Sequence, residues 1–195
     1  MLFRSKRLYS TVNVQETTPS LWLTASEMAF CKAEGVLRGW NMGGGTAKEY
    51  YERGVTLSFN QWGADGVVNY LLDDTSTEAN YADALGGFGG AAAKASTITI
   101  KWDDNAPMDE KMERLITQKW IALFPNGQEA WNEIRRTGYP RIFSVPQATN
   151  GYMLLTPNRI PFDKNQQINN RSNYDKAVEL LGGPDDYATP MWWQR

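Results

Sequence analysis

Aromatic side chains next to amides and carboxylates are the residues of this chain best equipped to bind a ligand. The sequence contains 8 Trp, 9 Tyr and 7 Phe. A flat aromatic ring packs against the apolar face of a ligand ring, and neighbouring polar side chains bond the ligand's hydroxyl groups. Five residues at expected loop edges are the candidate ligand-binding residues: Trp40, Asn41, Trp62, Tyr70 and Trp102. Packing inside the fold is the alternative role for each of them.

Side chains that could catalyse a reaction are scarce. The sequence has no histidine, which removes the commonest general base and the nucleophile pairs that depend on it. Its one cysteine, Cys31, lies in a helical pattern and is predicted to be a small buried residue rather than a reactive thiol. Glu113 and Glu133 fall at positions that we interpret as solvated helix surface, so no two carboxylates are predicted to face each other across a cleft. We therefore expect that the chain is not an enzyme.

Metal, nucleotide and nucleic-acid sites are not predicted either. Two acidic clusters, residues 103–105 and 185–186, lack the spacing of a calcium-binding loop. The glycine-rich segment 86–93 lacks the lysine and hydroxyl residue that complete a phosphate-binding loop. The net charge of -2 indicates no basic surface for nucleic acid. We expect no cofactor, no metal and no nucleic-acid partner.

The first strong signals of secondary structure are two capping boxes. Thr24 and Thr46 each precede a glutamate by three positions, the spacing at which hydroxyl and carboxylate satisfy each other's free backbone amides. Apolar residues at three- and four-residue intervals then predict helices to about residue 37 and about residue 61. Gly54 lies inside the second helix, where glycine is costly, so we expect a partner helix to approach closely there. Residues 23–62 are predicted to form a helical hairpin like those of TPR repeats.

A second helical hairpin is predicted over residues 106–138. Pro107 suits a helix start, acidic residues occupy the first turn, and apolar residues recur to about residue 124. A shorter helix follows and is ended by glycine and proline. Lys119 interrupts the apolar face of the longer helix, and we expect its stem to pack while its amine reaches solvent. Trp120 and Trp131 are predicted core residues.

The remaining segments carry weaker patterns. Thr75 and Glu78 have the spacing of a third capping box, which predicts a short helix ending near Gly86. Strict alternation over residues 97–102 predicts a short strand, and the pattern over residues 174–181 predicts one more helix. The two tryptophans at positions 192 and 193 are expected to plug the end of the fold.

The predicted fold class is mainly α, with TPR-like helical hairpins and long irregular segments. The chain is interpreted as a single region, residues 1–195, with five parts. These are an extended lead-in (1–22), a helical hairpin (23–62), an irregular part with a short helix (63–105), a second hairpin (106–138) and an irregular tail with one helix (139–195).

Several motifs, in a fixed order, resemble those of the SusD/RagB family. The segments that carry the resemblance are SEMAFCKAEG at 26–35, MERLITQKWIALF at 112–124, GQEAW at 127–131, RRTGYP at 135–140 and PNRIP at 157–161. Asn169 and Asn170, and the closing segment from Asp186 to Trp193, are similar to the family's last elements. The resemblance covers nearly the whole chain and corresponds to the C-terminal portion of the family.

The resemblance implies an outer-membrane lipoprotein that binds oligosaccharides, or sometimes peptides, and works with a TonB-dependent transporter in nutrient uptake. It implies the extracellular face of the outer membrane and membrane association only through a lipid anchor. This sequence shows no signal peptide, no cysteine placed for lipidation and no apolar run of the ~18 residues that span a bilayer. The alternative is a C-terminal scaffold portion that mediates protein–protein contacts and has no ligand site of its own.

Overall fold

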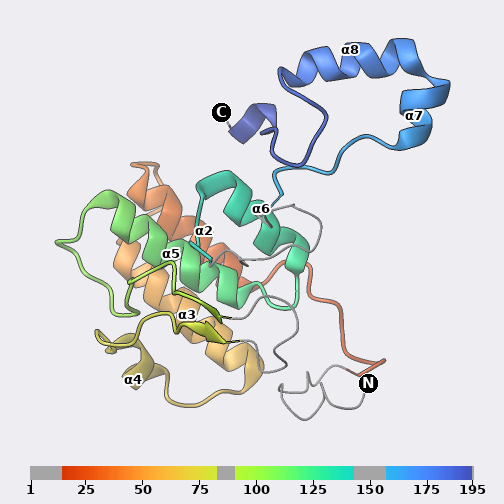
Figure 1. Cartoon of the computed structure of the whole chain (residues 1–195). Coiled ribbons are helices and arrows are strands. Elements are labelled where there is room, and N and C mark those ends of the chain that lie inside the picture. Colours follow the sequence, from red (N-terminus) through yellow and green to blue (C-terminus); the bar gives the residue numbers. More distant parts are fainter. Residues whose placement is uncertain (1–14, 83–90, 143–156, 195) are drawn as a thin grey trace.

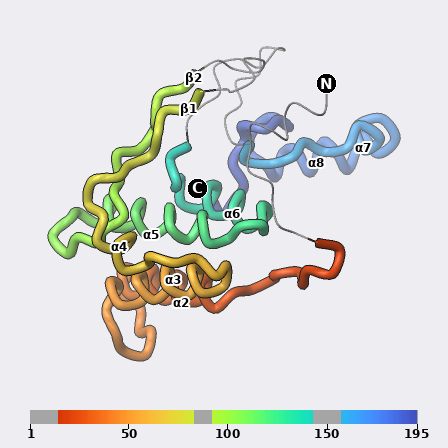
Figure 2. The backbone as a smooth tube through the Cα atoms, turned by 90° about the horizontal axis from the view of Figure 1, so that it is seen from below, coloured from red at the N-terminus to blue at the C-terminus, as the bar shows by residue number. Residues whose placement is uncertain are grey.

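The computed structural model describes residues 15–82, 91–142 and 157–194. Four helices make up the body: α2 (Ala25–Leu37), α3 (Ala47–Trp62), α5 (Met108–Ala122) and α6 (Gly127–Thr137). Figure 1 shows α5 lying beside the α2–α3 pair, and Figure 2 shows the same body from below. The expectation of a mainly helical fold is confirmed.

The remaining elements connect and extend this body. They are α4 (Val67–Leu71), α7 (Lys164–Asn169), α8 (Arg171–Leu181) and the 3-10 helix η1 (Trp192–Gln194). Strands β1 (Tyr81–Ala82) and β2 (Ala91–Ala92) pair antiparallel, with Tyr81 opposite Ala92. Helices α7 and α8 lie away from the four-helix body (Figure 1).

The first hairpin forms as the capping residues predict. The Thr24 hydroxyl accepts the Glu27 backbone N–H at 3.1 Å, and at Thr46 the complete reciprocal capping box is present. Gly54 lies where α2 and α3 meet, since a Cβ atom there would stand 2.8 Å from the ring of Phe30. The Ser26 hydroxyl donates to the Gly54 carbonyl at 2.7 Å. The predicted close approach at Gly54 is therefore confirmed.

A Gly54→Ala variant is expected to lower the free energy of unfolding by about 1–3 kcal/mol, because the new methyl group overlaps the Phe30 ring. The matched control is Gly127→Ala, at the first position of α6, where an added Cβ meets no atom within 4 Å. There the higher helix propensity of alanine should leave stability unchanged or slightly raised. Urea unfolding of the two variants checks this, and a Gly54→Ala chain as stable as the control would contradict the contact.

The core is centred on aromatic rings between the first hairpin and α5. The Tyr51 ring lies 6.2 Å from Phe30 and 5.1 Å from Trp102, and the Tyr51 hydroxyl donates to the Ile100 carbonyl at 2.6 Å. Leu115 of α5 belongs to the same buried cluster, and its neighbour Ile116 is also fully buried. Trp102 is only 6% exposed, and its ring N–H donates to Asp104.

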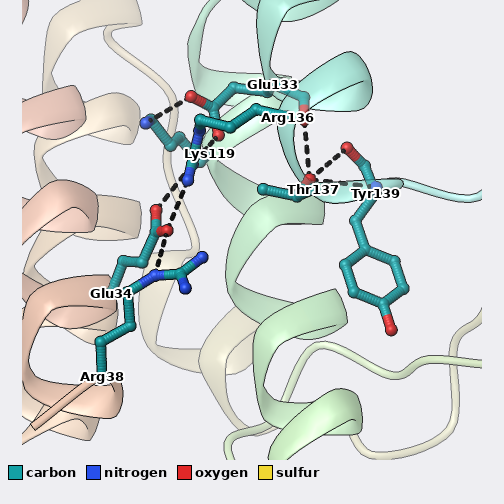
Figure 3. A network of polar contacts seen from close by, with 7 residues as sticks. All are labelled: Glu34, Arg38, Lys119, Glu133, Arg136, Thr137 and Tyr139. Atoms are coloured by element: carbon teal, nitrogen blue, oxygen red, sulfur yellow. Dashed lines mark hydrogen bonds and ion pairs between the residues drawn. The ribbon is translucent and has the colours of Figure 1, made fainter. Parts of the chain in front are cut away.

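A network of charges, in which two carboxylates and one lysine are buried, joins α2, α5 and α6 (Figure 3). Glu34 receives two hydrogen bonds from Arg136, at 2.6 and 2.7 Å, and one from Arg38 at 2.8 Å. Glu133 accepts one hydrogen bond from Arg136 at 2.7 Å and another from the Lys119 amine at 2.8 Å. Lys119 and Glu133 are 4% and 6% exposed, so the predictions of a solvent-reaching amine and a solvated glutamate are wrong.

The pKa of Glu34 predicts how stability depends on pH. Burial by itself raises this pKa, but the hydrogen bonds and charges of Arg136 and Arg38 outweigh burial, and the pKa lies below its ordinary value of 4.5. The unfolded chain then binds the proton more readily than the folded chain does. The stabilisation by Glu34 is present above pH 4.5 and is lost as the pH falls through the lowered pKa. A Glu34→Gln variant should therefore lose less stability than the parent chain on acidification below pH 4.5, as measured by urea unfolding at several pH values.

The irregular part differs from its prediction. The expected helix from Thr75 does not form over residues 75–82, and its predicted end near Gly86 lies outside the described residues. The Asp73 carboxylate accepts the backbone N–H groups of Thr75 and Ser76, at 2.9 and 2.8 Å, which stabilises a turn instead. Residues 97–102 are not a strand, whereas α4 and α7 were not predicted.

The tail is held against α6 by polar contacts. The Trp131 ring N–H donates to the Pro157 carbonyl at 2.7 Å, and Arg135 donates to the Asn158 carbonyl at 2.8 Å. The Arg135 guanidinium also lies 3.7 Å from the ring centre of Trp131 and 4.8 Å from that of Trp193. Trp192 is 80% exposed, so the predicted plug is wrong for that residue.

Candidate functional site

Three neighbouring hollows lie along one side of α5. The central hollow, of about 290 Å³, lies between α5, α4 and three irregular segments at residues 76–78, 96–100 and 140–142. Among its lining residues are Tyr70, Glu78, Ile98, Gln118, Trp120, Ile121 and Arg141. A further hollow in the tail, between Gly182 and Pro190, is lined without any aromatic side chain.

The central hollow combines aromatic rings with a positioned polar pair. Trp120 and Ile121 come from α5, and Tyr70 comes from α4. The Tyr70 hydroxyl donates to the Gln118 side-chain oxygen at 2.9 Å. Burial raises the pKa of Tyr70, which keeps its hydroxyl protonated at neutral pH. The hollow therefore offers flat rings and fixed polar groups, the combination that binds a partly apolar, hydroxyl-bearing ligand.

The apolar hollow, of about 350 Å³, adjoins the central one toward the C-terminal end of α5. Trp120 and Ile121 line both hollows, and Phe124, Pro125, Asn126, Gly127 and Ala130 complete the apolar one. The Trp62 ring lies 5.7 Å from the Phe124 ring. Trp62 is 43% exposed, so it stands beside this hollow with part of its ring accessible to solvent.

The polar hollow, of about 360 Å³, adjoins the central one at the other end, toward the start of α5. Ile98 and Arg141 line both of them. Three carboxylates and two guanidinium groups are among its lining residues: Asp109, Glu110, Glu113, Arg114 and Arg141. Glu113 accepts the Ser96 hydroxyl at 2.6 Å and lies 3.4 Å from the Arg141 guanidinium.

The three hollows follow the repeat of the helix. Glu110, Arg114, Thr117, Ile121 and Phe124 recur at intervals of three or four residues and line one hollow or another. At 1.5 Å per residue they extend over about 20 Å of helix. Because neighbouring hollows share lining residues, we call the three together the α5 groove.

One of the five sequence candidates lines this groove, and a second contacts one of its lining residues. Tyr70 lines the central hollow, and Trp62 contacts Phe124 of the apolar hollow. Trp40 is 62% exposed and lies 6.0 Å from the Arg38 guanidinium, and the Asn41 side chain accepts the Gly43 N–H. Neither Trp40 nor Asn41 lines the groove. Trp102 belongs to the core, where its burial leaves no ring face for a ligand.

Trp120 is the residue that the sequence interpretation misplaced. It was predicted as core, but it is only partly buried and separates the central hollow from the apolar one. Its position in the helical repeat distinguishes Trp120 from the core residues. It lies beside Thr117, Ile121 and Phe124, which form a second stripe of α5. This stripe is next to the buried stripe that contains Leu115 and Lys119. A helix with two such stripes can face the core with one and a ligand with the other.

Metal binding and membrane crossing find no support in the part of the chain that the structure describes. No cluster of three or more Cys, Asp or Glu side chains there could hold a metal ion. None of the helices described is long and apolar enough to cross a membrane. Cys31 is half-buried in α2.

Comparisons with known proteins agree over nearly the whole chain. The family model described as "Susd and RagB outer membrane lipoprotein" matches residues 3–194. A solved SusD homolog from Bacteroides uniformis is 43% identical, with a TM-score of 0.88, over 96% of this chain and 39% of that chain. A SusD homolog from Bacteroides vulgatus is 38% identical, with a TM-score of 0.84, over 95% of this chain and 38% of that one.

A chitin-binding SusD homolog from Flavobacterium johnsoniae is 41% identical, with a TM-score of 0.79, over 89% of this chain and 36% of that chain. The sequence thus spans less than two fifths of the length of each of these three relatives. A comparison with curated proteins gives no match.

Proposed function

Because this chain belongs to the SusD-like family of outer membrane lipoproteins, we propose that it binds oligosaccharides in the α5 groove and catalyses no reaction on them. The observation that carries the proposal is the position of Trp120 between two adjoining hollows. A sugar ring has an apolar face, which packs on an aromatic ring, and an edge of hydroxyl groups, which needs polar partners. Trp120 supplies the first, and the Tyr70–Gln118 pair supplies the second.

The carboxylates of the groove support binding rather than catalysis. Glycoside hydrolysis needs a carboxylic acid and a second carboxylate on opposite sides of the scissile bond. Glu78 uses one oxygen to accept the backbone N–H groups of Ala95 and Ser96, at 2.8 and 3.0 Å. Glu113 is engaged by Ser96 and Arg141. Asp109 and Glu110 stand side by side on the first turn of α5 rather than facing each other.

Capture at the outer membrane, in partnership with a TonB-dependent transporter, completes the proposal. The support for it is family membership, since the matching model describes outer membrane lipoproteins. On this proposal the groove holds an oligosaccharide at the cell surface before import.

A protein-contact role is the second candidate function, and it has its own observation. Several large apolar side chains of the tail are exposed, and exposed apolar surface can serve protein contacts. They are Ile160 at 74%, Ile168 at 75%, Leu180 at 88% and Trp192 at 80%. In this alternative the tail binds another protein and the chain recognises no glycan.

Titration calorimetry with a panel of oligosaccharides distinguishes these functions. The panel comprises chito-, cello-, malto- and xylo-oligosaccharides, and the chito series is first because the Flavobacterium relative is chitin-binding. We expect saturable binding of one series, with every sugar recovered intact by mass spectrometry. If no series binds, glycan capture by this chain is contradicted and the protein-contact role is favoured. Shortened sugars would contradict the non-enzymatic role.

A further inference from the structure

We propose that the polar hollow is a second sugar subsite, which makes the preferred ligand a neutral oligosaccharide rather than a single sugar or an acidic one. This inference rests on the proposed function, because it assigns the next unit of a glycan whose first unit lies in the central hollow. The two hollows share Ile98 and Arg141, so a chain of linked sugars can pass from one to the other.

An unsatisfied buried donor is the first observation behind this subsite. Arg114 lines the polar hollow and is only 5% exposed. Its Nε atom donates to the Thr99 carbonyl at 3.1 Å, but its Nη1 atom has no hydrogen-bond partner among the described residues. A buried guanidinium donor without a hydrogen-bond partner lowers the stability of the fold, and native structures rarely contain such a donor. A ligand hydroxyl entering the hollow could supply the acceptor.

The balance of donors and acceptors indicates the chemistry of the ligand. Asp109 and Glu110 are exposed carboxylates that we call the rim of the hollow, and they offer acceptors in the same hollow as the donors of Arg114 and Arg141. A sugar hydroxyl both donates and accepts, so it can use both kinds of group at once. Hydrogen bonds to charged groups are stronger than those between neutral groups.

The charge of the hollow disfavours an acidic sugar. Three carboxylates and two guanidinium groups line the hollow, and Glu113 already pairs with Arg141 at 3.4 Å. A uronate would add a further negative charge to this surplus, which disfavours its binding. A neutral sugar unit meets no such repulsion and gains the same hydrogen bonds.

The test measures how affinity depends on the length of the sugar chain. Chitobiose, chitotetraose and chitohexaose, or the same lengths of another neutral series if that is the one that binds in the panel, are titrated into the parent chain. The double variant Asp109→Asn with Glu110→Gln removes two carboxylate charges from the rim without touching buried Arg114. The matched control is Asp175→Asn with Glu179→Gln, which makes the same charge change on exposed positions of α8.

We expect the tetraose to bind the parent chain roughly tenfold more tightly than the biose, through hydrogen bonds to charged groups. The rim variant should lose this gain and bind the biose as before, and the control should behave like the parent. An oligogalacturonate should fail to compete with the tetraose.

Two results would overturn the subsite without touching the proposed function. A parent chain that binds biose and tetraose equally well would mean that the polar hollow holds only water. An unchanged tetraose affinity in the rim variant would mean that Asp109 and Glu110 do not bind the sugar. Effective competition by the oligogalacturonate would contradict a neutral ligand. If neither the parent chain nor the control binds any sugar, it is the proposed function itself that fails.

Discussion

An Ile121→Arg variant is expected to bind the oligosaccharide at least roughly thirtyfold more weakly than the parent chain, which corresponds to ~2 kcal/mol at a central contact. Ile121 lines both the central and the apolar hollow, so a long charged side chain there enters the space that the sugar needs. The residue is 48% exposed, and its replacement should therefore leave the core and the thermal midpoint nearly unchanged. Calorimetric titration and thermal unfolding of the same sample give both quantities.

Leu180→Arg is the matched control for this variant. It makes the same kind of change, from a large aliphatic side chain to arginine, at an 88% exposed position of α8 that does not line the groove. We expect parent-like glycan affinity from it. Equal affinity of the two variants would remove the α5 groove as the binding site. Loss of binding in Leu180→Arg alone would move the site to the tail.

A Glu133→Ala variant is expected to lower the free energy of unfolding by about 3–5 kcal/mol, because it leaves a buried charge without its partner. The Lys119 amine lies 2.8 Å from Glu133, and the two side chains are 5% and 8% exposed. Arg136 loses its hydrogen bond to Glu133 but keeps two to Glu34, so the charge left without a partner is that of Lys119. Urea unfolding monitored by tryptophan fluorescence measures the change.

Two further variants separate the charge effect from the loss of packing. Replacing both partners with apolar residues, Lys119→Met with Glu133→Leu, should recover much of the stability, since no unpaired charge then remains in the interior. Glu129→Ala, on the first turn of the same helix, should cost less than about 1 kcal/mol. A Glu133→Ala loss no larger than that of Glu129→Ala would show that water reaches Lys119.

The body helices were predictable because their signals are local. Thr24, Thr46 and Asn126 accept backbone N–H groups at helix starts, and Gly138 ends α6 in a left-handed conformation. Each of these roles depends only on residues within one turn. Gly54 was informative for the same reason: an unfavourable residue inside a good helix pattern indicates a neighbour that needs the space.

The third capping-box spacing shows where local signals fail. Glu78 has the correct distance from Thr75, but its carboxylate accepts the amides of Ala95 and Ser96, seventeen and eighteen positions further along. Asp73 meanwhile accepts the Thr75 amide, which Glu78 was expected to accept, together with the Ser76 amide. Spacing in the sequence cannot distinguish a side chain that caps its own helix from one that binds a distant segment.

The groove and the charge network were not predictable because both form between distant segments. Lys119 and Glu133 each look like solvated charge on a single helix, and only the packing of α6 on α5 buries them together. Tyr70 stays a prediction as a ligand-binding residue, and the structure places it in the central hollow with its hydroxyl bonded to Gln118. Trp40 and Asn41 stay predictions, and the structure places them on the loop between α2 and α3.

A crystal structure of the chain grown with the tightest-binding oligosaccharide of the panel tests glycan capture in the α5 groove most directly. We predict one sugar ring packed against Trp120 in the central hollow and the next unit within hydrogen-bond reach of Arg114 in the polar hollow. A sugar bound instead beside Trp40, or along the exposed side chains of the tail, would contradict the groove. A groove left without sugar at saturating concentration would contradict it as well.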